Sequence, residues 1–217
     1  MAPRLVILLG PPACGKGTQA KLLGDLYGWR TFSTGAAIRS HVQQGTEFGK
    51  RFEEMLGSAY LLPDSVILEL VKSELEDHTG GLILDGFPRT VPQACMFDDL
   101  CAHKGWKIDA VITFEASEQA LEARVANRLT CMSCGGTYRQ GMHGLLLDSP
   151  CPHCGGKLGR RKDDSSEVFK QRFQEFLSLT QPLVDFYKRR GLLHRIDALT
   201  PSNVLALQLE TYLTTLK

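Results

Sequence analysis

The chain alternates short, unbroken apolar runs with longer segments in which apolar residues recur every three or four positions. The unbroken runs, at residues 5–9, 81–87, 108–116 and 192–198, are typical of strands buried on both faces of a sheet, and residues 31–32 indicate a further short strand. Helical spacing occupies residues 16–28, 63–77, 117–129 and 165–191. The alternation predicts an α/β fold with a parallel sheet covered by helices on both faces.

Local signals set the expected limits of these helices. Gly28 is a stop signal for the first helix, and Ser117 is a candidate N-cap. Pro182 is expected to kink or break the long helical segment that contains it. The first helix carries an apolar stripe made of Leu22, Leu23, Leu26 and Tyr27.

Residues 131–164 break the pattern, because periodicity vanishes and glycine, cysteine, proline and histidine accumulate. The segment is too long for a structureless loop and needs its own means of folding. It holds two CxxC pairs separated by 16 residues: Cys131 with Cys134, and Cys151 with Cys154. Four thiolates at this spacing predict a closed, structural zinc site whose binding energy folds the segment. The alternatives are iron in the same site, two disulfides, or a site in which His143 or His153 replaces a thiolate.

Composition narrows the class of protein. A chain of 217 residues fits one domain, or one domain with insertions. Its net charge of +1 offers no electrostatic footprint for a long nucleic acid or an anionic membrane. With no transmembrane-length run and no evident export signal, the seven cysteines indicate a reducing compartment, the cytoplasm, and favour metal ligation over disulfides. Nothing forces association, so we expect a monomer.

Residues 5–19 carry the first chemical motif. A buried strand leads through Gly10 and two prolines to Gly15, Lys16, Gly17 and Thr18 at the start of a helix. Such a turn directs backbone N–H groups at an anion, and the helix dipole adds positive potential. Lys16 supplies a cation for β- and γ-phosphates, and Thr18 supplies a hydroxyl near the metal. The residue after the lysine is a glycine, where the common signature has Ser or Thr. Cys14 is either a reactive thiol in this electropositive loop or a small filler residue.

Charged residues at later positions suit the same chemistry. Asp85 ends a strand at the sheet edge where ligands bind, so it can hold magnesium through water or merely cap a turn. Arg89 follows within reach of a phosphate, and Arg124 and Arg128, four residues apart, are expected on one helical face. Further arginines are either solvated surface residues or the charges that phosphoryl transfer requires: Arg39, Arg160, Arg161 and Arg172.

Taken in order, these segments resemble adenylate kinase over nearly the whole chain. They are GPPACGKGTQ, STGAAIR, LLPD, DGFPRT with a following glutamine, RRKDD, and the later helix bearing Arg172. The resemblance implies a P-loop kinase core with a five-stranded parallel sheet, a helical nucleoside-monophosphate-binding segment at 33–62 and a zinc-bearing lid at 127–164. It further implies reversible phosphoryl transfer from magnesium ATP to AMP, giving two ADP, and a role in adenylate homeostasis.

The resemblance also implies residue roles. Thr34 and Gln93 would read the AMP adenine, and Asp163 and Asp164 would help close the lid. The implied catalytic residues are Lys16, Asp85, Arg128, Arg161 and Arg172. The implied ATP-binding residues are Gly10, Cys14, Gly15, Lys16, Gly17, Thr18, Arg124, Arg128 and Thr200. The implied AMP-binding residues are Thr34, Arg39, Leu62, Gly86, Arg89, Gln93, Arg161 and Arg172.

Three alanines depart from the family pattern and bear on nucleotide preference and turnover. Ala13 stands where a glycine is usual and requires a negative φ or some strain. Ala36 replaces an aspartate, and Ala198 replaces a glycine beside the loop implied to contact the ATP adenine. The rival classes are a zinc-ribbon nucleic-acid binder with an ATPase core and a switch GTPase. The ribbon lacks a net basic surface and stacking aromatics, and the chain has no guanine-reading NKxD motif. A kinase for another nucleoside monophosphate is the rival within the enzyme class, disfavoured by Gln93 and the long lid.

Overall fold

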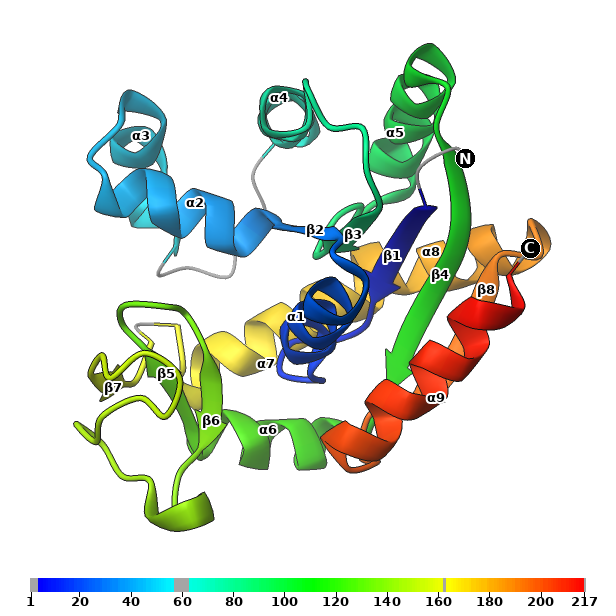
Figure 1. Cartoon of the computed structure of the whole chain (residues 1–217). Helices are drawn as coiled ribbons and strands as arrows, with labels where there is room; N and C mark the ends of the chain where they lie inside the picture. Colours follow the sequence, from blue (N-terminus) through cyan, green and yellow to red (C-terminus); the bar gives the residue numbers. More distant parts are fainter. Residues whose placement is uncertain (1–3, 57–62, 162, 217) are drawn as a thin grey trace.

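A five-stranded parallel sheet in the order β2-β3-β1-β4-β8 forms the centre of the computed structural model, which describes residues 4–56, 63–161 and 163–216 (Figure 1). Its strands are β1 (Arg4–Leu9), β2 (Arg30–Ser33), β3 (Leu82–Asp85), β4 (Lys107–Glu115) and β8 (Leu193–Asp197). Every pairing is parallel. The five predicted strands are confirmed, each with ends within two residues of the predicted limits.

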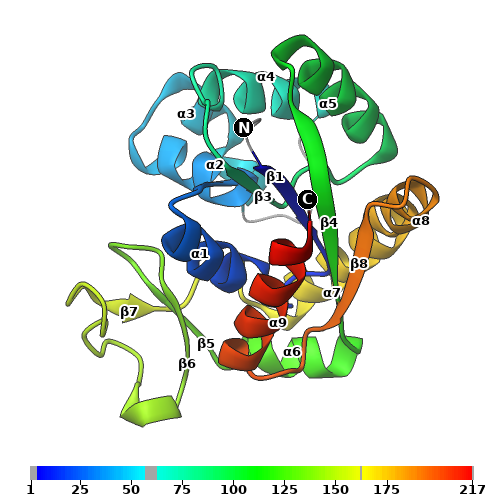
Figure 2. The same cartoon turned by 45° about the vertical axis from the view of Figure 1, so that its right-hand side comes forward.

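Helices cover both faces of this sheet because alternate residues of β1 point to opposite sides. Val6 and Leu8 pack with α1 (Lys16–Tyr27), α6 (Glu118–Ala126), α7 (Ser166–Glu175) and α9 (Ser202–Thr215). Leu5, Ile7 and Leu9 pack with α4 (Asp64–Glu74), α5 (Val91–Lys104) and α8 (Gln181–Arg189). Figure 2 shows α1 and α9 side by side in front of the sheet. No helix among the described residues has the length and apolar character needed to cross a bilayer.

The predicted helix signals are confirmed in part. Gly28, at φ 66°, ends α1, and the Ser117 hydroxyl accepts a hydrogen bond from the backbone N–H of Ala120. A five-residue π-helix, η2 (Phe176–Thr180), interrupts the long segment just before α8, whose first turn holds Pro182. The apolar stripe of α1 is only partly buried: Leu23 is 1% exposed, whereas Leu22 is 41% and Leu26 55% exposed.

The helix predicted over residues 117–129 is shorter than expected. It ends at Ala126, and Arg128 is the first residue of β5 (Arg128–Cys131). The prediction that Arg124 and Arg128 share a helical face is therefore wrong. Arg128 pairs with Arg139 of β6 (Thr137–Arg139) in an antiparallel ladder, and this pairing overrides the local helical pattern.

Two parts project from the same side of the core in both views (Figures 1 and 2). One contains α2 (Thr34–Gln43) and α3 (Glu47–Leu56). The other is a second, antiparallel sheet in the order β6-β5-β7, with β7 at Leu158–Gly159 and a short 3-10 helix, η1, at Met142–Gly144. This second part spans most of the segment predicted to be irregular, and its strands are too short to show a period in the sequence.

Candidate active site

The loop between β1 and α1 depends on two glycines at positive φ. A Cβ at Gly10, where φ is 144°, would lie 2.9 Å from both the Cys14 Sγ and the Phe114 carbonyl oxygen. Gly15, at φ 101°, caps the N-terminus of α1. Ala13 has φ 62°, a left-handed conformation that is strained for a residue with a Cβ. The sequence allowed Ala13 either a negative φ or some backbone strain, and the structure shows the strained conformation.

The Lys16 side chain folds back over this loop. Its Nζ donates to the carbonyl oxygens of Gly10 at 2.8 Å and Pro11 at 2.9 Å, and lies 3.4 Å from the Cys14 Sγ. Cys14 itself is 1% exposed and packs in the core, so its geometry favours the filler role over that of an accessible, reactive thiol. The ammonium is thus held by two backbone carbonyls of the loop, beside the N-terminus of α1.

Gly17, the unusual residue after Lys16, lies against Asp85. A Cβ at Gly17 would be 3.2 Å from the Asp85 Oδ2, closer than side chains normally approach. The contact follows from the topology, because β3 pairs with β1 and places Asp85 opposite Leu8 at the edge of the sheet where the loop begins. The predicted position of the Asp85 carboxylate is confirmed, and the glycine leaves room for it.

Five arginines from separate parts of the chain lie close enough to interact electrostatically: Arg39, Arg89, Arg128, Arg161 and Arg172. Asp163 pairs with Arg161 at 3.3 Å and with Arg172 at 2.6 Å. Asp164, whose side chain is 1% exposed, accepts from the Arg128 Nε at 3.0 Å. The charge of Arg172 acts on the pKa values of the remaining two, Arg39 and Arg89. Five of the predicted arginines are therefore gathered, and Asp163 and Asp164 pair with three of them. Arg160 lies apart from them: it is exposed and donates to the Gln140 Oε1 at 3.0 Å.

Burial, followed by repulsion between neighbouring arginines, lowers the pKa values of three members of this cluster. Desolvation and the neighbouring charge of Arg172 lower the pKa of Arg89 to about 10, against the opposing effect of Asp85. Although Arg39 is solvent-accessible, desolvation and the charge of Arg161 lower its pKa to about 10 as well. Desolvation also lowers the pKa of Arg161. The cluster lies close to Asp85 and hence to the glycine-rich loop, and an anion would complete its charge balance.

The residues implied to hold the acceptor nucleotide lie around the end of β3. The Thr34 hydroxyl and the Arg89 Nε both donate to the Gly86 carbonyl oxygen at 2.9 Å. Gln93 is 2% exposed, and its Nε2 donates to Asp64 Oδ1 at 2.6 Å. Asp64 is a partner that the sequence did not assign, although the LLPD segment contains it. Leu62 lies outside the described residues.

Arg124 ties the loop to the segment after β8. Its Nη2 donates to the Ala198 carbonyl oxygen at 2.7 Å, and its Nη1 reaches the Cys14 carbonyl oxygen at 3.4 Å. Thr200 lies two residues beyond Ala198 and is partly exposed, with its backbone N–H donating to Asp197. The structure thus brings Arg124 and the segment bearing Thr200 to one side of the loop, as the resemblance implies for a nucleotide site.

The four paired cysteines gather into one cluster in the antiparallel sheet. Their Sγ atoms all lie within 4.8 Å of one another, with Cys131 and Cys154 at 3.5 Å and Cys134 and Cys151 at 3.8 Å. Four sulfurs about 2.3 Å from one zinc ion would be about 3.8 Å apart, so the cluster fits a tetrahedral zinc site. All seven cysteines are free thiols, which contradicts the disulfide alternative, and neither His143 nor His153 belongs to the cluster.

Hydrogen bonds favour the thiolate form at two of the four cysteines, Cys131 and Cys151, whereas at Cys154 a backbone hydrogen bond is outweighed by hydrogen bonds to the other cysteines, which raise its pKa to about 12. The Tyr138 hydroxyl lies 3.1 Å from the Cys151 Sγ. Desolvation raises the pKa of Cys151, but the hydrogen bonds from Tyr138 and from the backbone outweigh it and lower the pKa to about 6. Backbone hydrogen bonds likewise lower the pKa of Cys131. Buried residues around the cluster are few, namely Leu129 and Leu158 besides two of the cysteines, so the antiparallel sheet has little apolar core of its own.

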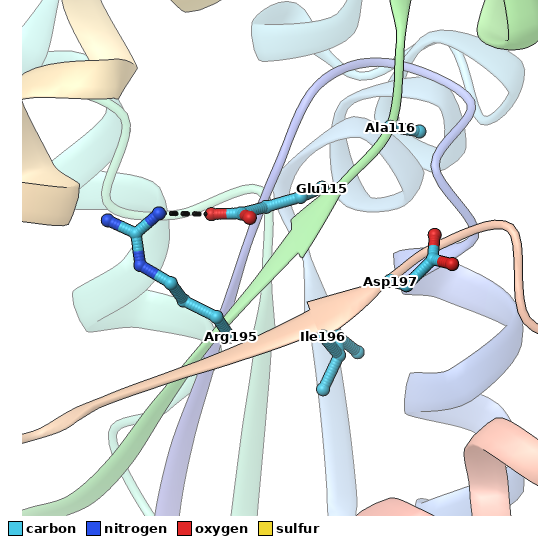
Figure 3. A pocket seen from close by; sticks show the side chains of 5 residues that line it. All are labelled: Glu115, Ala116, Arg195, Ile196 and Asp197. Atoms are coloured by element: carbon cyan, nitrogen blue, oxygen red, sulfur yellow. Dashed lines mark hydrogen bonds and ion pairs between the residues drawn. The ribbon is translucent and has the colours of Figure 1, made fainter.

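A shallow hollow at the ends of β4 and β8 is unrelated to these groups (Figure 3). It is lined by Glu115, Ala116, Arg195, Ile196 and Asp197. Glu115 and Arg195 form an ion pair at 2.5 Å whose side chains are each 49% exposed, the kind of surface pair that contributes little stability. No residue with a predicted role lines this hollow.

The parallel sheet, the glycine-rich loop and the basic cluster beside it define the class of protein: a P-loop nucleotide kinase. A model of the adenylate kinase family matches residues 8–192. The adenylate kinase of Archaeoglobus fulgidus is 40% identical over 194 residues, covering 88% of this chain and 89% of the relative. That of Finegoldia magna is 37% identical over 210 residues, covering 96% of this chain and 98% of the relative. The chain therefore belongs to the adenylate kinase family and is an enzyme of nucleotide phosphoryl transfer.

Proposed function

We propose that this protein transfers a phosphoryl group reversibly from magnesium ATP to AMP, giving two ADP, and so serves adenylate homeostasis. The observation that carries the proposal is the meeting of five arginines beside the glycine-rich loop, where burial and mutual repulsion lower the pKa values of three of them. Transfer of a phosphoryl group spreads negative charge over three oxygens, and catalysis consists mainly of positioning and charge stabilisation.

The residues of the loop would hold the donor nucleotide. Lys16 would exchange its bonds to the Gly10 and Pro11 carbonyls for β- and γ-phosphate oxygens, and Arg124 would lie beside the ATP adenine. The oxygens of Asp85 and Thr18 suit magnesium, which binds oxygen ligands and keeps much of its hydration. When bound, magnesium would neutralise phosphate charge.

The acceptor would bind at the end of β3. Arg39 and Arg89 would hold the AMP phosphate, and Thr34 and Gln93 would contact the adenine. An AMP phosphate oxygen then forms a bond to the γ-phosphorus as the bond from that phosphorus to the ADP oxygen breaks. Arg128, Arg161 and Arg172 would stabilise the charge on the transferred group. No side chain must act as a base, because the attacking phosphate is already an anion.

Residues 33–62 would form the AMP-binding segment. Residues 127–164 would form a mobile lid that closes over both nucleotides and excludes water, which would otherwise accept the phosphoryl group. A zinc ion on Cys131, Cys134, Cys151 and Cys154 would make this lid rigid. From its composition, we further propose that the protein is a monomer located in the cytoplasm, without nucleic-acid or membrane partners.

A coupled assay of ADP formation tests the proposal. The enzyme is given magnesium ATP with AMP, CMP, UMP or GMP as acceptor, and a reaction without acceptor serves as the control. We expect AMP to give the highest kcat/KM and the control to give little ADP. Dominant hydrolysis without AMP, or a preference for another acceptor, would contradict it.

A further inference from the structure

The side-chain amide of Gln93 is held in one orientation by two neighbours. Its Nε2 donates to the Asp64 Oδ1 at 2.6 Å, and its Oε1 accepts from the backbone N–H of Arg89 at 2.8 Å. Asp64 begins α4, whereas Gln93 lies in the first turn of α5. Thr90 completes the arrangement, since its hydroxyl donates to the Asp64 Oδ2 at 3.2 Å and accepts from the Gln93 N–H at 3.1 Å.

The polarity of these two neighbours forbids the reversed amide. An ionised carboxylate only accepts hydrogen bonds, and a backbone N–H only donates them. Rotating the amide by half a turn would place Oε1 against the Asp64 carboxylate and Nε2 against the Arg89 N–H. Both hydrogen bonds would be lost in a site where Gln93 is 2% exposed and water cannot readily replace them.

In the proposed complex, the fixed amide would offer the acceptor base one donor and one acceptor. The amide nitrogen has a second hydrogen and the oxygen a second lone pair. Adenine matches this pair, because its ring nitrogen N1 accepts and its 6-amino group donates. A 6-oxopurine has the reverse pattern, with a donor at N1 and an acceptor at O6.

This inference rests on the proposed function, in which Gln93 contacts the acceptor base. We propose that Asp64 is a positioning residue: by fixing the amide of Gln93, it makes the acceptor site select adenine over 6-oxopurine nucleotides. Asp64 itself need not touch the nucleotide.

The test compares AMP with inosine monophosphate as acceptors at saturating magnesium ATP. Asp64→Asn offers Gln93 either a donor or an acceptor, and Asp64→Ala removes the partner altogether, so the result does not depend on one variant folding. In both variants, reversal of the amide forfeits only the bond from Arg89. We expect the ratio of kcat/KM for AMP to kcat/KM for inosine monophosphate to fall by about tenfold, since a hydrogen bond to a charged group contributes roughly that factor.

Thr90→Val is the matched control. It removes the hydroxyl that contacts Asp64 and caps α5 but keeps the bond between Asp64 and Gln93, so we expect a lower Tm with an unchanged ratio. If the ratio were unchanged in both Asp64 variants, the inference would be overturned, but the proposed AMP kinase function would still stand. An equal fall in Thr90→Val would indicate general loosening and would also overturn it. A wild-type enzyme that does not phosphorylate AMP would instead defeat the proposed function, and this inference with it.

Discussion

Ala13→Gly is expected to stabilise the protein. Ala13 has φ 62°, and an L-residue in this left-handed region costs about 1–2 kcal/mol relative to the right-handed region. Glycine removes that strain but adds freedom to the unfolded chain, which costs about 0.4–1 kcal/mol. The net gain lies between about 0 and 1.6 kcal/mol, with a midpoint of about 0.8 kcal/mol. For a chain of this size, that corresponds to a rise in Tm of roughly 1–4 °C.

Ala36→Gly provides a control with the same chemical change in the opposite setting. Ala36 is exposed in α2, where helical φ suits alanine, so glycine should cost about 1 kcal/mol and lower the Tm. Calorimetric melting of the three proteins without nucleotide measures both effects. If Ala13→Gly lowered the Tm as much as Ala36→Gly, the left-handed alanine would carry no strain and the reasoning would be refuted.

Three further predictions concern the metal site, the loop and the basic cluster. Chelation should release one zinc ion per chain and lower the Tm by roughly 10 °C, because a ligand at 1,000 times its Kd contributes about 4 kcal/mol; an unchanged Tm would exclude a structural metal. Gly17→Ala should crowd the Asp85 carboxylate and lower kcat by about tenfold with little change in Tm, whereas an unaltered kcat would show that the carboxylate can move. Burial would raise the pKa of Asp163, but Arg161 and Arg172 outweigh it and lower the pKa below 3.8. Its ion pairs therefore stabilise the fold above about pH 4, and this stability is lost as the pH falls through the lowered pKa. The loss of stability in Asp163→Asn should thus shrink below pH 4, and a constant difference from wild type down to pH 2 would contradict this.

The strands were predictable because each is buried on both faces, so its apolar run is unbroken. The sequence patterns did not identify α5, whose buried residues include the polar Gln93 alongside Ala94 and Phe97. They also missed α9, although Leu205, Leu209 and Leu213 recur every four positions. The omission of α5 has a physical reason: Gln93 is polar yet buried, because it forms a hydrogen bond to Asp64 of α4, and this interrupts the apolar pattern. The periodic signal for α9, by contrast, was present in the sequence.

Contacts between distant parts of the chain limit what the sequence can predict about the site. Motif order placed Lys16, Asp85 and the arginines in one region, and the structure brings them together. It did not predict that Arg128 leaves the helix of Arg124, because that depends on pairing with β6. Nor did it assign Asp64, whose partner Gln93 lies 29 residues away in the chain.

The glycine after Lys16 illustrates how topology explains a motif that local sequence can only describe. β3 pairs with β1, so the Asp85 carboxylate is brought beside position 17 as the strands end together. The space that Ser or Thr would occupy in the common signature is adjacent to a carboxylate oxygen, 3.2 Å from where a Cβ would lie. A side chain at 17 would therefore require the Asp85 carboxylate to shift slightly from its present position. Gly17 leaves the Asp85 carboxylate undisturbed, and the first hydroxyl after Lys16 belongs to Thr18, one residue further along the helix.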